Sequence, residues 1–179
     1  MSDVLYRTTL PLMMFGPYTR KTSKVVGTKA DGKKIYKYGK ERVVLKEGVD
    51  KGMFPSVNNL YVSGKGGSVT RSAMAKRHIN LWRTLVQSDW MNLYEGPIKD
   101  KKLYLDCYFV MPDNKKRDTS NVLKMLPDAL EGVLYENDYY LLPRVQDFII
   151  SEDGSSYLMI ELRYANEDSR PEWTQLLET

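Results

Sequence analysis

The sequence predicts an α+β fold, and two kinds of periodicity support this. Apolar and other residues alternate as in β-strands from Leu103 to Met111 and again from Ser156 to Tyr164. Apolar residues three and four positions apart, as on one side of an α-helix, run from Ser72 to Ser88. A chain of 179 residues can bury a core without disulfide bonds. Both kinds of element therefore belong in one folded protein.

The N-terminal part reads as a strand followed by a basic hairpin. The strand runs from Val4 to Met14, and its proline weakens the pairing. The hairpin runs from Lys21 to Leu45 around Ala30-Asp31-Gly32, since Asp-Gly favours a tight turn. Its many lysines indicate an excursion from the core.

A loop and a helix follow the hairpin. The loop, rich in glycine and asparagine, runs from Phe54 to Ser68, and the helix from Ser72 to Ser88. The residues expected on the apolar side of the helix are Ala75, His78, Ile79, Trp82, Leu85 and Val86, and those away from it are Lys76, Arg77, Asn80 and Arg83. His78 is most simply half-buried and hydrogen-bonded.

A second helix with its entry loop is predicted from Asp118 to Gly132. Asp118 or Ser120 can cap its start, and the glycine ends it. Pro127 removes one backbone donor and should kink or shorten this helix. Two further strands, 141–150 and 156–164, are expected to pair as a hairpin around Glu152-Asp153-Gly154, and the tail from Glu167 to form a short amphipathic helix.

Composition excludes several classes of protein. A single cysteine, Cys107, rules out an internal disulfide and a cysteine-rich zinc site, and its apolar surroundings favour a buried structural thiol. A single histidine, His78, removes most histidine-based chemistry. No apolar run approaches the roughly 20 residues of a membrane span. An intracellular protein that uses carboxylates is the remaining interpretation.

Positive charge is clustered along the chain. From Arg20 to Lys46 there are ten lysines and arginines against only Asp31 and Glu41, and the run of Lys115, Lys116 and Arg117 lies further on. Such clustering is typical of a polyanion binder, although a solvated surface remains the alternative. The interleaved Tyr36, Tyr38, Tyr61 and Trp82 could stack on bases or could belong to the core.

The segment from Lys115 to Tyr140 carries the clearest chemical pattern. Asp118 and Asp138 bracket a short helix whose polar side reads Asn121, Lys124 and Asp128. Carboxylates that hold a hard divalent cation, with a lysine beside them and a basic approach, suit phosphodiester hydrolysis. The pattern predicts a metal-dependent nuclease.

Two patches together resemble the RusA-type Holliday junction resolvases. One patch is RDTSNVLKMLPDALEGVLYENDYYL, from Arg117 to Leu141, and the other is PSVNNLYVSGKGGSVTRSAMAKRHINLW, from Pro55 to Trp82. The second is similar to the family's Pro-Ser-x-Asn-x-x-Tyr loop with its following Arg, Ser and helix. Order and spacing agree from about Phe54 to Leu162, roughly two-thirds of the chain. The resemblance implies one two-layer domain over residues 1–179: a mixed sheet packed by two main helices, with 16–52 as a basic β-hairpin insertion and 165–179 as a tail.

The resemblance also implies residue roles. Asp118 and Asp138 match the catalytic aspartates, Lys124 the catalytic lysine and Asn121 the neighbouring asparagine. The family's second aspartate is Ser120 here, a neutral and weaker metal ligand. Asp128 is a candidate for the missing charge, with Glu136 and Asp106 as weaker candidates.

Each role has a simpler alternative. Asp118 and Ser120 are also ordinary helix caps, Asp138 is also an ordinary turn former, and Lys124 also suits pairing with Asp128 along a helix.

The implied activity is Mg²⁺- or Mn²⁺-dependent hydrolysis of a DNA phosphodiester by a homodimer that makes paired symmetric nicks in branched DNA. The expected location is the cytoplasm, with no membrane attachment. The residues expected to contact DNA are Asn58, Asn59, Tyr61, Lys65, Arg71, Lys76, Lys115, Lys116, Arg117 and Asn121.

Three interpretations stay open at this point. The first is an active junction endonuclease. The second is a protein that binds branched DNA but cuts poorly because of Ser120. The third is a small enzyme that handles nucleotides or phosphate, which the dispersed basic surface makes less attractive.

Overall fold

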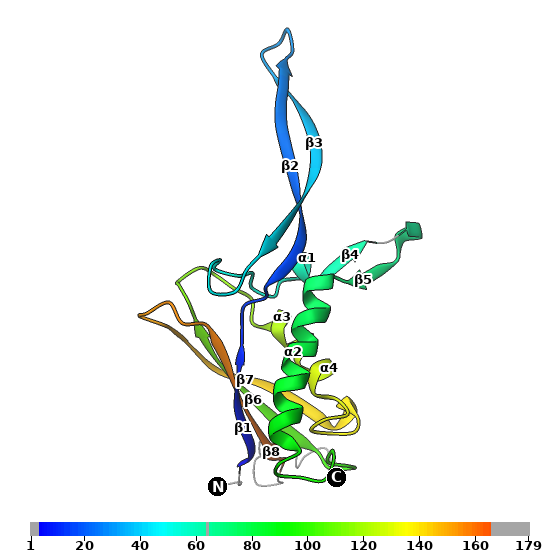
Figure 1. The fold of residues 1–179 in the computed structure, drawn as a ribbon, viewed down its shortest axis with the longest axis vertical. Helices are drawn as coiled ribbons and strands as arrows, with labels where there is room; N and C mark the ends of the chain where they lie inside the picture. Colours follow the sequence, from blue (N-terminus) through cyan, green and yellow to red (C-terminus); the bar gives the residue numbers. More distant parts are fainter. Residues whose placement is uncertain (1–3, 64, 166–179) are drawn as a thin grey trace, which may run out of the picture. The chain divides into compact units, whose positions relative to one another are not determined.

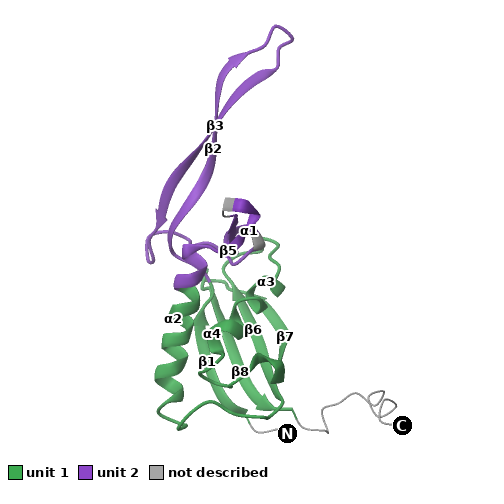
Figure 2. Ribbon diagram, turned by 90° about the vertical axis from the view of Figure 1, so that its right-hand side faces the viewer, with its two compact units in different colours: residues 1–12, 78–179 green, residues 13–77 purple. Residues whose placement is uncertain are grey.

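The computed structural model describes residues 4–63 and 65–165. The chain divides into two compact units, residues 1–12 with 78–179 and residues 13–77, which Figure 2 shows in green and purple. Each unit is described separately below. The predicted helix after Glu167 lies outside the described residues.

The first unit is built on a four-stranded mixed sheet (Figure 1). Its strands are β1 (Val4–Pro11), β8 (Tyr157–Tyr164), β6 (Leu103–Met111) and β7 (Leu141–Ile150), in that spatial order. Strand β8 is antiparallel to both β1 and β6, while β7 is parallel to β6. The predicted α+β class is therefore confirmed.

The predicted hairpin between residues 141–150 and 156–164 is wrong. Both strands form, but β6 lies between them. The turn signal was real, because the side chain of Asp153 accepts a hydrogen bond from the amide of Ser155 at 2.8 Å. A link of six residues, 151–156, is long enough to cross one intervening strand, which requires only about 10 Å. Strand β8 thereby fully buries Leu158, Ile160 and Leu162.

Helix α2 (Ala73–Trp90) covers one face of this sheet through its residues in the first unit. The indole of Trp82 donates to the carbonyl of Pro11 at 2.8 Å, and the rings of Tyr6 and Trp90 meet edge to face at 5.5 Å. The predicted apolar side of the helix is buried except at Leu85, which is 40% exposed. Leu85 therefore lies at the margin of the packed stripe.

The predicted second helix is broken into two pieces, α3 (Ser120–Leu123) and α4 (Leu126–Leu130). Proline explains the break, because the ring of Pro127 clashes with the carbonyl four residues earlier in a continuous helix, and that residue is Leu123. Gly132 follows α4 with a φ of 76°, in agreement with the expected glycine stop. Asn121 and Asp128 therefore do not share one helix face, contrary to the sequence-based expectation.

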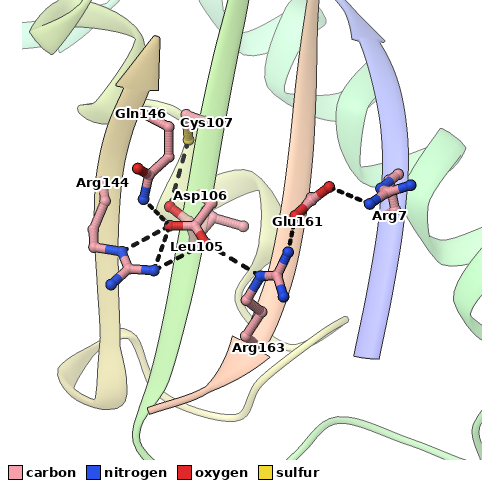
Figure 3. Close-up of polar contacts among 8 residues, drawn as sticks. All are labelled: Arg7, Leu105, Asp106, Cys107, Arg144, Gln146, Glu161 and Arg163. Carbon is pink, nitrogen blue, oxygen red and sulfur yellow. Dashed lines mark hydrogen bonds and ion pairs between the residues drawn. The ribbon is translucent and has the colours of Figure 1, made fainter. Parts of the chain in front are cut away.

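Polar residues, of which Asp106 and Glu161 are buried, form a network across the opposite face of the sheet (Figure 3). Asp106 of β6 accepts hydrogen bonds from Arg144 at 2.7 and 2.9 Å and from Gln146 at 2.5 Å, and it pairs with Arg163 at 3.4 Å. Glu161 of β8 pairs with Arg163 and, at 2.5 Å, with Arg7 of β1. This charge network, defined by these six residues, connects all four strands.

The single histidine and the single cysteine are both interior. His78 is only 3% exposed, so it is more deeply buried than expected, and desolvation lowers its pKa to about 4. Cys107 is fully buried, as expected of a structural thiol, and desolvation raises its pKa to about 12. Neither side chain is arranged for nucleophilic chemistry.

The second unit contains the predicted basic hairpin, formed by β2 (Gly16–Thr28) and β3 (Lys34–Leu45). These two strands pair only with each other among the described residues. The segment expected to be a loop, 54–68, is more ordered than predicted: it forms α1 (Val57–Leu60), β4 (Tyr61–Ser63) and η1 (Lys65–Gly67), and β4 pairs with β5 (Val69–Arg71). Positive φ angles at Gly66 and Gly67 allow the reversal between β4 and β5.

Candidate functional site

The basic run before Asp118 is held by an acidic residue that the sequence analysis did not single out. Asp113 follows β6, and its carboxylate accepts hydrogen bonds from the Arg117 guanidinium at 2.5 Å and from the Lys115 amide at 3.0 Å. The Arg117 contact is the main reason that the pKa of Asp113 falls to about 2. The Arg117 side chain is only 11% exposed. This turn thereby fixes the approach to Asp118.

Asp118, Ser120, Asn121 and Lys124 lie together in one chain of polar contacts. The Ser120 amide donates to Oδ1 of Asp118 at 3.0 Å, and the Asn121 side-chain nitrogen donates to the Asp118 carbonyl at 3.2 Å. Nζ of Lys124 lies 3.4 Å from Oδ1 of Asn121. Asn121 is 5% exposed, whereas Asp118 and Lys124 are exposed. The buried side chain of Asn121 thus connects the backbone of Asp118 to the exposed ammonium group of Lys124.

The local environment keeps Asp118 ionised. The Ser120 hydroxyl, then the Ser120 amide and then the nearby charge of Lys124 hold the pKa of Asp118 below its ordinary value of 3.8. Thr119 occupies the N-cap position of α3, so Asp118 lies one residue before the cap and contacts the first helical residue, Ser120. It is an exposed anion at neutral pH, and the Ser120 amide contacts only its Oδ1 oxygen.

A cavity of about 320 Å³ adjoins the same turn. Its lining residues are Met111, Asp113, Asn114, Lys115, Lys116, Arg117, Thr119, Phe148 and Ile150. Phe148 is 58% exposed although it belongs to the sheet. The predicted DNA-contacting run therefore borders an apolar wall. The sequence indicated this wall only through the apolar residues at the end of β7. The wrongly predicted hairpin paired β7 with the following strand, so it did not place that end beside the basic run.

The other acidic candidates lie in different settings. Asp138 is exposed and opens the short helix η2 (Asp138–Tyr140), just before β7. Asp128 is half-buried in α4, where its carbonyl accepts a 2.7 Å hydrogen bond from Arg83. Glu136 pairs with Lys99 at 3.2 Å, and Asp106 is engaged in the charge network. The two weaker candidates thus already have cationic partners.

Within residues 4–63 and 65–165, no three histidine, cysteine, aspartate or glutamate side chains gather as a metal-binding group. Asp118 and Ser120 nevertheless supply an ionised carboxylate and a hydroxyl two positions apart on an exposed turn. Oxygen donors of this kind suit Mg²⁺ and Mn²⁺. The metal roles of Asp118, Asp138, Ser120 and Asp128 stay predictions.

The remaining predicted DNA contacts belong to the second unit. Asn58 is exposed on α1, while the Asn59 side chain donates to the Phe54 carbonyl at 3.1 Å and so holds its own loop. Tyr61 and Arg71 face each other across β4 and β5, and Lys76 is exposed on α2. Lys65 lies in η1. Contact with DNA stays a prediction for each of them.

Comparison with known proteins agrees with the motif at Asp118. The family model described as endodeoxyribonuclease RusA matches residues 53–161, more than half of the 179-residue chain. The chain therefore belongs to the RusA family. It is similar to the crossover junction endodeoxyribonuclease RusA of Aquifex aeolicus (strain VF5), with 28% identity over 108 residues, which are 59% of this chain and 81% of the relative.

The matched region includes every predicted site residue and excludes the β2–β3 hairpin. Among the described residues, no helix is both long and apolar enough to span a membrane.

Proposed function

We propose that this protein is a metal-dependent endonuclease that resolves Holliday junctions and other branched DNA by paired symmetric nicks. Membership of the RusA family supports an endodeoxyribonuclease. The observation that carries the proposal is the chain of contacts from Asp118 through Asn121 to Lys124, because it joins the backbone of an exposed, ionised aspartate to an exposed cation within one short segment. The relative's name supports a branched DNA substrate.

Asp118 and Asp138 would hold one or two Mg²⁺ or Mn²⁺ ions, with Ser120 as a neutral ligand and Asp128 as a source of further charge. When bound, such an ion polarises the scissile phosphate and makes the attacking water easier to deprotonate.

The protein side chains have separate roles in this proposal. Lys124 neutralises the negative charge that builds on the phosphate or the leaving oxygen. Asn121, buried and 3.4 Å from the lysine, is a positioning residue for that cation. Ser120 orients the carboxylate of Asp118 through its amide and its hydroxyl. The basic run Lys115–Arg117 binds the phosphates that flank the scissile bond.

Two paired nicks require two paired active sites, so the active form is proposed to be a homodimer. The chain is proposed to be one RusA-like domain with a two-layer packing, in which residues 16–52 form a basic insertion. The family match begins at residue 53, and this supports the insertion.

One observation favours a second candidate function. Position 120 carries a hydroxyl that already contacts Asp118, so the site has one carboxylate fewer than the family motif implies. A protein of this kind would bind branched DNA tightly and cleave it slowly.

The test uses purified full-length protein with a labelled four-way junction and a linear duplex, each with and without Mg²⁺ or Mn²⁺. Symmetric nicks in the junction that disappear in Asp118→Asn support the endonuclease. The matched control is Asp100→Asn, the same chemical change at an exposed aspartate outside the site, which should cut normally. Tight junction binding without cleavage in either metal would favour the second candidate. Equal binding to both DNAs would contradict both.

A further inference from the structure

The β2–β3 hairpin is a long two-stranded ribbon with most of its surface exposed to solvent. Strands of 13 and 12 residues make it about 40 Å long at roughly 3.3 Å per residue. Every residue from Thr28 to Arg42 is exposed, so this stretch buries no core. Figure 1 shows a twisted ribbon formed only by these two strands. A ribbon of this kind is marginal in water on its own.

The pairing register separates the ribbon into two different faces. Residues directly opposite each other share a face, so Lys21 lies with Lys40 and Thr19 with Arg42 on one side. This side is here called the cationic face, and its charged and aromatic residues are Lys21, Lys34, Tyr36, Tyr38, Lys40 and Arg42. No acidic residue points to it between Gly16 and Leu45. The reverse face carries Lys24 opposite Lys37, and its Arg20 is neutralised by Glu41 at 2.7 Å.

Like charges directly across a ribbon are destabilising, typically by a few tenths of a kcal/mol to about 1 kcal/mol per pair. The ribbon contains two such pairs, Lys21 with Lys40 and Lys24 with Lys37, and no buried core offsets their cost. A polyanion placed against the ribbon removes the repulsion, and so its charge pattern is complementary to a polyanion.

The aromatic residues of the cationic face have no core role. Tyr36 is 47% exposed and Tyr38 is 77% exposed, and their ring centroids lie 6.3 Å apart. The sequence left open whether these two tyrosines belong to the core, and the structure shows that both are exposed to solvent. Together with the lysines they form a surface of rings and cations, which is typical of nucleic-acid contact.

We propose that the cationic face docks along a duplex arm of the DNA substrate, with the ribbon in the major groove. The major groove of B-DNA is about 12 Å wide and admits a two-stranded ribbon. Lysines at the ribbon edges reach the phosphates on both sides, while Tyr36 and Tyr38 face the groove. The proposal rests on DNA being the substrate of the proposed function, and it does not depend on cleavage.

The test compares two matched double variants of the full-length protein. Lys21→Gln with Lys40→Gln removes one like-charge pair from the cationic face, and Lys24→Gln with Lys37→Gln removes the corresponding pair from the reverse face. Affinity for a four-way junction with long arms is measured across a salt series. Loss of two phosphate contacts should reduce the slope of log K against log salt by about 1.8 for the first variant. The second variant should keep nearly the wild-type slope.

Further probes identify the partner. A double variant with Tyr36→Ala and Tyr38→Ala should weaken long-arm binding without changing the salt slope. Arms shortened to about 8 base pairs should abolish the difference between the two lysine variants. Duplex RNA of the same sequence should not distinguish them, because its major groove is too narrow. The proposal would be overturned if the two lysine variants differed in binding to anionic lipid vesicles or single-stranded DNA but not to duplex arms.

The outcomes separate this inference from the proposed function. If both lysine variants lose the same affinity, the proposal that DNA docks on the cationic face is overturned, whatever the cleavage result. If only the cationic-face variant changes the salt slope and the protein never nicks DNA, the result supports DNA binding by the ribbon and contradicts only the proposed nuclease activity.

Discussion

The Ser120 amide donates a 3.0 Å hydrogen bond to Oδ1 of Asp118, and the Ser120 hydroxyl is the largest cause of the lowered pKa of that carboxyl. Serine at position 120 therefore supports the neighbouring carboxylate although it adds no charge of its own. The two contacts fix the orientation of that carboxylate on its exposed turn.

The first prediction concerns the missing charge. Ser120→Asp should lower the Mg²⁺ concentration needed for half-maximal cleavage by about tenfold, because a second carboxylate on the turn adds on the order of 1.4 kcal/mol to cation binding. Junction cleavage as a function of Mg²⁺ concentration measures this effect.

The matched change Ser120→Ala should have the opposite effect, since it removes the hydroxyl that contacts the carboxylate of Asp118 and is the proposed neutral ligand. An unchanged Mg²⁺ requirement in both variants would show that position 120 does not contact the ion.

The second prediction concerns the acidic residue that holds the basic run. Asp113→Asn should steepen the salt dependence of DNA binding, because it removes a negative charge next to Lys115 and Arg117. The same change should lower the cleavage rate of bound DNA, because Arg117 loses the contact that orders the turn before Asp118. Filter binding and single-turnover cleavage separate the two effects. A faster single-turnover rate would contradict the ordering role.

Local chemistry in the sequence predicted the elements well but predicted their pairing less well. The strand from Leu103 to Met111 was predicted at its observed bounds, because its alternation is strong and its flanks are polar. The false hairpin arose because Asp153-Gly154 does form a turn, while the choice of strand partner depends on burial of Leu158 and Ile160 in the whole sheet. Strand pairing is set by tertiary packing, and a local turn signal carries no information about it.

The candidate site shows the same division. Asp118, Asn121 and Lys124 were found from their spacing, and the contacts that join them span only a few residues along the chain. Asp113 and Phe148 were missed for different reasons. The first is important through a side-chain contact with Arg117, and the second through the parallel pairing of β7 with β6. Neither relationship follows a local pattern.

The third prediction concerns the charge network. Asp106→Asn should lower the free energy of unfolding by about 2–4 kcal/mol, because it removes the buried carboxylate that pairs with Arg144 and Arg163 and leaves Arg163 only its pair with Glu161 on this network. Urea unfolding followed by circular dichroism measures the loss. The control is Glu136→Gln, which removes a surface ion pair with Lys99 and should cost less than about 1 kcal/mol. Similar losses in both variants would mean that the network contributes no more than a surface pair.

The fourth prediction concerns pH. Burial lowers the pKa of His78 from 6.5 to about 4, so the unfolded chain takes up a proton below pH 6.5 while the native imidazole stays neutral until about pH 4. Since the unfolded state binds more protons in this window, the free energy of unfolding should fall as the pH falls, by up to about 1.4 kcal/mol per pH unit.

The fourth prediction is tested with His78→Phe, which keeps an aromatic ring beside Trp82, 4.6 Å from the imidazole in the native protein, and removes the titration. Its absolute stability will differ from that of the wild type, so the informative quantity is the slope between pH 7 and 4.5, measured by urea unfolding. The slope of the wild type should exceed that of the variant throughout this window. Equal slopes would mean that the native imidazole takes up its proton at the same pH as the unfolded chain.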